Sequence, residues 1–230
     1  MREYTPLSRR TIVTLTRSIG VGFLLAILFT PVACAPKPFD SIEPFSRDRI
    51  GALRRSTELT LATLDSAVTA TLHAFDTAEG LCSEPGESLD IAYATARGEQ
   101  SAARGRQQSF VRRVSTTRAG GEALFEEWRA ELREYHDESV AQASRESLER
   151  LHAAFASLMS ALDAVQAELL PALIPIEDRV LYLKHSRNEG PLATRPAVTP
   201  FITGRLDRVR TLAEEARRAG AEFEAATAGR

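Results

Sequence analysis

Seven apolar residues at spacings of three and four constrain the fold of this chain more than any other feature. They are Leu148, Leu151, Phe155, Leu158, Leu162, Val165 and Leu169. This spacing places all seven on one face of an α-helix, as in the seam of an antiparallel bundle or coiled coil. A single helix cannot bury such a seam alone, so the segment predicts a fold in which helices pack on helices.

Three more segments have the same periodicity. They extend from Ile50 to Phe75, from Leu89 to Tyr135 and from Ile202 to Phe223. Residues 80–86, 136–139 and 188–200 are rich in breakers or polar residues and separate the segments. We find no strand-like alternation. The chain is therefore predicted to be all-α: an elongated, coiled-coil-like antiparallel bundle of about four helices.

Glycines and prolines predict local departures from straight helices. Gly120 and Gly121 together would destabilise a helix by ~2 kcal/mol relative to two alanines, so a kink or break is expected there. Pro171 and Pro175 each remove a backbone donor, which predicts a kink in the third helix. In the last segment, small residues predict the close approach of a neighbouring helix at Ala213, Ala216 and Gly220.

The N-terminal residues have the features of an export signal. Basic residues precede an apolar stretch, Val21 to Phe29, which ends in small residues and Cys34. The interrupted stretch is shorter than the ~20 residues that span a bilayer. The order resembles a bacterial lipoprotein signal, in which the cysteine is acylated. An ordinary cleavage site at Ala33-Cys34-Ala35 is the alternative, although Pro36 disfavours it.

This interpretation divides the chain into three parts: residues 1–33 as the signal, 34–44 as the lipidated cysteine with a Pro-rich tether, and 45–230 as one helical bundle. Ser8-Arg9-Arg10 fits either a twin-arginine signal or an ordinary basic flank. We expect the lipid to anchor the protein on the periplasmic side of the cell envelope. Ala35, rather than an aspartate, after Cys34 favours the outer membrane.

Charge and cysteine content exclude some partners. The chain has 29 Lys and Arg against 31 Asp and Glu; without residues 1–33, 25 and 30 are left. Such an acidic chain is not expected to bind nucleic acid. With Cys34 acylated, Cys82 has no partner within the chain, and we interpret it as unpaired, with an intermolecular disulfide as the alternative.

No catalytic motif is found, so we expect neither an enzyme nor a cofactor. Glu149 and His152 have the Glu-x-x-His spacing of di-iron bundles, but no second copy exists and no metal is expected. Trp128 is in phase with its neighbouring leucines and is interpreted as a core residue, as are Tyr135 and Tyr182.

Two sequence blocks resemble a known family. The block from Ala123 to Trp128, Ala-Leu-Phe-Glu-Glu-Trp, and the block from Val180 to His185, Val-Leu-Tyr-Leu-Lys-His, are similar to those of bacterial lipoproteins with a domain of unknown function, DUF2959. Pro171 stands where the family has a central proline. Relatives have Asn-Leu-Asn after the histidine, whereas this chain continues into a Pro-rich insertion. The resemblance implies no known activity.

Two functions are compatible with these features. The first is a structural or adaptor bundle that binds another envelope protein or itself. Its candidate interaction surface is Leu181, Tyr182, Lys184 and His185, although basic residues at a helix C-terminus also complement the helix dipole. The second is a binding module for a small apolar or lipidic ligand, in a pocket lined by Trp128, Tyr182 and Leu183. A straight antiparallel pair of helices would separate Trp128 from the other two.

Overall fold

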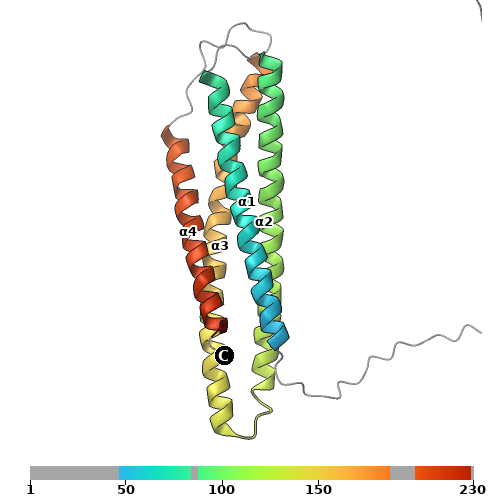
Figure 1. Cartoon of the computed structure of the whole chain (residues 1–230), viewed down its shortest axis with the longest axis vertical. Helices are drawn as coiled ribbons and strands as arrows, with labels where there is room; N and C mark the ends of the chain where they lie inside the picture. The colour runs from blue at the N-terminus through green and yellow to red at the C-terminus, as the bar shows by residue number, and fades with distance from the viewer. Residues whose placement is uncertain (1–46, 84–87, 187–199, 229–230) are drawn as a thin grey trace, which may run out of the picture. The chain divides into compact units, whose positions relative to one another are not determined.

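Four long helices make up the protein. The computed structural model describes residues 47–83, 88–186 and 200–228. The helices are α1 (Arg47–Ser83), α2 (Leu89–Glu131), α3 (Glu138–Ser186) and α4 (Pro200–Ala228), and all belong to one unit, Glu43–Arg230. They alternate in direction along the chain (Figure 1). The prediction of an all-α antiparallel bundle of about four helices is thus confirmed for the described residues.

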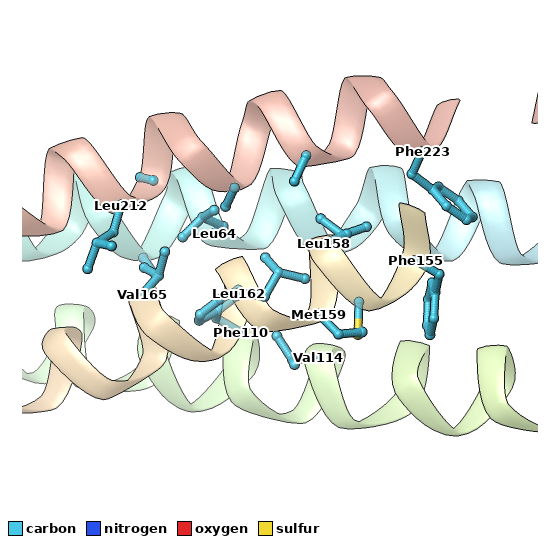
Figure 2. Packing of buried hydrophobic residues seen from close by; sticks show 14 of the residues in the cluster. Leu64, Phe110, Val114, Phe155, Leu158, Met159, Leu162, Val165, Leu212 and Phe223 are labelled. Atoms are coloured by element: carbon cyan, nitrogen blue, oxygen red, sulfur yellow. The ribbon is translucent and has the colours of Figure 1, made fainter. Parts of the chain in front are cut away.

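The predicted seam of α3 forms the centre of the core. All seven of its residues are buried, and Leu158, Leu162, Val165 and Leu169 have no exposed surface. Figure 2 shows how α3 side chains point between the other helices, toward Leu64 of α1, Val114 of α2 and Leu212 of α4. Burial of a leucine or phenylalanine contributes about 1.5–3 kcal/mol, so this seam makes a large contribution to bundle stability.

The two ends of the bundle differ. At one end, α1 begins beside the last turns of α2, where Arg49 forms an ion pair with Glu127. The α2–α3 hairpin extends beyond the start of α1 at this end (Figure 1). At the other end, Val180 and Leu183 of α3 pack with Ala96 of α2. We call these the hairpin end and the distal end.

Helix α2 is continuous through Gly120 and Gly121, so the predicted break is wrong. Gly121 is buried, and a Cβ atom on it would overlap with the ring of Phe155. Gly120 is exposed, and a Cβ atom there would meet nothing within 4 Å. The intrinsic preference against glycine is therefore overridden by tertiary packing, because only glycine leaves room for the Phe155 ring.

Helix α3 continues through both of its prolines, from Glu138 to Ser186. The kink at Pro171 and Pro175 stays a prediction. By length and composition α3 would also qualify as a membrane span, a test that the central helix of a packed bundle passes as well. Its buried seam, in contact with three other helices, accounts for that apolar composition here.

Hydroxyl groups form a buried layer between α1 and α2. Thr117 Oγ1 is 2.6 Å from Ser56 Oγ and 2.8 Å from Thr60 Oγ1. Thr60 and Thr117 have no exposed surface. Since buried hydroxyl groups need hydrogen-bond partners, these pairs favour one register of the two helices.

An aspartate caps the start of α3. Asp137 Oδ1 accepts hydrogen bonds from Ser139 Oγ at 2.6 Å, from Ser139 N at 2.8 Å and from Val140 N at 3.3 Å. The Ser139 hydroxyl first, and then these two backbone groups, lower the pKa of Asp137 below its ordinary value of 3.8, because they stabilise the carboxylate. Ser88 occupies the N-cap position of α2 without a side-chain cap hydrogen bond.

Candidate functional site

The predicted interaction surface lies at the distal end of α3. Leu181 is 52 % exposed and Tyr182 37 %, and both Lys184 and His185 are exposed. Leu183, between them, is fully buried and packs toward α2. The structure therefore places the four predicted residues on the outside of the bundle while their neighbour fixes the helix to the core.

A groove lies beside this surface, where α3 faces the start of α2. It has a volume of about 610 Å³. Val180, Leu181 and Lys184 line it from α3, and Tyr93 and Arg97 from α2. Apolar side chains next to basic ones at such a site suit the binding of a partner that presents apolar and acidic groups.

Charged residues stabilise the groove without closing it. Glu177, on the groove wall, forms an ion pair with Arg104 of α2 at 2.5 Å. The guanidinium of Arg179 lies 5.5 Å from the centre of the Tyr182 ring, a cation–π distance. The ion pair joins α3 to α2, and the cation–π contact within α3 orients Tyr182 at the surface.

Two further apolar residues extend the surface along α3. Leu170 is 52 % exposed and Ile174 is 51 % exposed. At 100° per residue they lie within about 40° of Leu181 around the helix axis, so the three form one stripe about 16 Å long. Sequence reasoning missed Leu170 and Ile174, although both are apolar and out of phase with the buried seam, which is the signal that identifies them.

The aromatic predictions have mixed outcomes. Trp128 is 2 % exposed and donates a hydrogen bond from Nε1 to Ser144 Oγ at 2.9 Å, so its assignment to the core is confirmed. Tyr135 is 41 % exposed and Tyr182 37 %, so their assignment to the core is wrong. Tyr135 lies in the turn after α2, where no helix covers it, and Tyr182 lies outside the α3 seam.

The predicted pocket shared by Trp128, Tyr182 and Leu183 does not exist. Trp128 bonds to Ser144 near the start of α3, and Tyr182 is 38 residues further along the same helix. At 1.5 Å per residue these positions are about 57 Å apart. Trp128 therefore belongs to the hairpin end and Tyr182 to the distal end.

The other candidate residues are separate from this surface. Glu149 and His152 are exposed on α3, and the described residues contain no group of three side chains suited to hold a metal ion. Cys34 lies outside the described residues. Cys82 is in the last turn of α1, and its side chain is also outside the description.

Comparison with known proteins identifies the family. A family model described as a protein of unknown function (DUF2959) matches residues 41–216. The chain therefore belongs to this family, and the resemblance carried by the blocks at 123–128 and 180–185 is confirmed. Neither curated proteins nor solved structures gave a match.

Proposed function

We propose that this DUF2959 protein is a lipid-anchored structural or adaptor protein of the bacterial envelope, and not an enzyme. In this proposal the distal end of the bundle binds a protein partner, which is another envelope protein or a second copy of the chain. The observation that carries the proposal is the exposed stripe of Leu170, Ile174 and Leu181 on a helix whose opposite face is fully packed. Exposed apolar residues gathered on one face are typical of protein interaction sites.

The position of the stripe supports this role. Helix α1 begins at the hairpin end, beside Glu127, so the chain leading back to Cys34 leaves the bundle there. The stripe and its groove lie toward the other end of α3, between residues 170 and 184. An anchor attached at Cys34 would leave the stripe free to meet a partner. We place this anchor on the periplasmic side of the outer membrane, from the sequence around Cys34.

Photocrosslinking in living cells tests the partner surface. A photoreactive residue at Lys184 is expected to give one discrete adduct, whereas the same residue at exposed Glu146, near the start of α3, serves as the matched control. Ile174→Asp and Leu181→Asp together should abolish the adduct without unfolding the bundle, because both side chains are about half exposed. The absence of an adduct at Lys184, or equal adducts at both positions, would contradict the proposal.

Metabolic labelling with a fatty acid tests the anchor separately. We expect the wild-type chain to incorporate the label and Cys34→Ser to lose it, since Cys34 provides the thiol that is acylated. Cys82→Ser is the control and should stay labelled. Label that persists in Cys34→Ser would show that the anchor has been assigned to the wrong residue.

A further inference from the structure

A second groove lies at the hairpin end, between the end of α2 and the start of α3. It has a volume of about 480 Å³. Its lining includes the apolar side chains of Leu132 and Leu148, of which Leu148 is buried. Arg129 and Arg133 line it from α2 and the turn that follows, and they are one helical turn apart.

The facing side of this groove is also basic. Arg145 and His152 line it from α3, seven residues and thus two turns apart. Glu149 is the carboxylate among the residues that line the groove. Three arginines and a histidine therefore line a groove that contains one acidic side chain.

Packing beneath the groove holds these groups in place. The hydrogen bond from Trp128 to Ser144 links the two helices, and the next residue on each helix is Arg129 or Arg145. The His152 ring packs edge-on against Phe125, with 4.9 Å between ring centres. The basic side chains thus start from a rigid base, which reduces the entropy lost when they bind a ligand.

The arginines of the groove are weakly neutralised by the protein itself. Among the described residues, Arg129 and Arg133 form no salt bridge. Arg145 donates to Gln142 Oε1 at 2.5 Å, and its nearest carboxylate contact is with Glu138 at 3.9 Å. These guanidinium groups retain donors for an external acceptor.

Charge across the whole hairpin indicates what kind of anion fits. Residues 129–152 contain four arginines but six Asp and Glu, so diffuse attraction to a negative surface does not favour binding there. A small anion that accepts hydrogen bonds from several guanidinium groups at once is favoured instead. Phosphate groups have this property, because their oxygens accept charge-assisted and bidentate hydrogen bonds from arginine in several directions.

The length of chain between Cys34 and α1 sets the distance over which this groove can reach the proposed anchor. Arg49, in the first turn of α1, pairs with Glu127, two residues before Arg129. Cys34 precedes the start of α1 by 13 residues, which reach at most about 45 Å when extended. A groove at this end is therefore within reach of a membrane that holds an acyl chain on Cys34.

We propose that the hairpin groove, formed by Arg129, Arg133, Arg145 and His152, binds a phosphate-type oxyanion, namely the headgroup of an anionic phospholipid. The oxyanion site depends on the groove alone. Its lipid source rests on the proposed anchor at Cys34. Bound in this way, the headgroup fixes the hairpin end at the membrane surface, while the acidic remainder of the hairpin prevents non-specific adsorption.

Native mass spectrometry of the full-length protein, purified from membranes in a non-ionic detergent, tests this proposal. The probes are phosphatidylglycerol, phosphatidylcholine and inorganic phosphate. We expect one tightly bound phosphatidylglycerol and no comparable adduct with phosphatidylcholine. Arg129→Gln with Arg145→Gln should weaken that adduct roughly tenfold or more, as expected from the loss of hydrogen bonds to a charged group. Arg106→Gln with Arg113→Gln, elsewhere on α2, is the matched control and should retain it.

The outcomes distinguish the oxyanion site from its lipid source, and the groove from the anchor. Equal adducts in both double variants would overturn the site, provided that circular dichroism shows both to be folded. Binding of inorganic phosphate as strong as that of the lipid would support the oxyanion site and overturn its lipid source. The same spectra report the mass of the acyl group on Cys34, so failure of the anchor is distinguished from failure of the groove.

Discussion

The adjacent glycines of α2 offer a direct test of the packing. Gly120 is exposed with open space around its Cα, whereas Gly121 is buried against the Phe155 ring. Gly120→Ala should stabilise the protein by about 1 kcal/mol, because alanine is the better helix former. For a chain of this size such a gain raises the melting temperature by roughly 2–4 °C.

Gly121→Ala has the same gain in helix propensity, but its methyl group would overlap with the Phe155 ring. That ring cannot move away freely, because it lies between Phe125, with 5.5 Å between ring centres, and Phe223, at 5.8 Å. Overpacking of this kind costs about 1–3 kcal/mol. Since the propensity gain is common to both variants, Gly121→Ala should be less stable than Gly120→Ala by that amount.

Thermal and urea unfolding followed by circular dichroism at 222 nm would measure this difference. A cycle that combines Gly121→Ala with Phe155→Leu supplies the control, because a smaller side chain at 155 should recover part of the loss. The expected coupling between the two sites is about 0.5–3 kcal/mol. Equal stability of the two alanine variants, or no coupling with Phe155→Leu, would refute the packing argument.

Other perturbations give equally specific expectations. Leu158→Asp should destabilise by several kcal/mol, since Leu158 has no exposed surface. His152→Ala, on the exposed side of α3, should cost no more than about 1.5 kcal/mol, the loss of its edge-on contact with Phe125; melting temperatures in the opposite order would disprove the seam. Thr117→Val should cost about 1–3 kcal/mol in urea unfolding, because two hydroxyl groups lose their buried partner, and Thr117→Ser should restore most of it. Asp137 has a lowered pKa in the folded state. Its contribution to the free energy of unfolding is therefore present above pH 3.8 and is lost as the pH falls through its folded pKa. The difference in melting temperature between wild type and Asp137→Ala should therefore shrink below that pH, whereas the difference between wild type and Asp137→Asn should be small at neutral pH, because asparagine also caps helices.

The regular part of the fold follows from the sequence because its signal is local. The spacing from Leu148 to Leu169 determines both the helix and its buried face, and no distant residue is needed to identify them. Gly121 shows where this local reasoning fails. The low helix propensity of glycine favours a break at this position. Gly121 is needed there because it makes room for the ring of Phe155, 34 residues away, and only the tertiary structure shows this contact.

The candidate sites were predictable to different extents. Leu181 and its neighbours were found from a sequence block, whereas Leu170 and Ile174 lie out of phase with the seam and could have been found from the same helical wheel. The hairpin groove could not be predicted from the sequence. It depends on bringing Arg129 and Arg145 to the same groove, which results from the packing of α2 on α3 and from the Trp128–Ser144 hydrogen bond between them.

The length of α3 separates the two grooves in space, and so separates the two functions proposed for them. This helix has 49 residues and therefore extends about 74 Å, with His152 near one end and Leu181 near the other. A small ligand cannot bridge the two, so a phosphate held at the hairpin and a partner held at the stripe would bind without direct contact. The helix is continuous and its buried seam is packed along its length, so the two sites stay apart. Loss of the headgroup site should therefore change how the bundle is held at the membrane while leaving the affinity of the distal stripe for its partner unchanged.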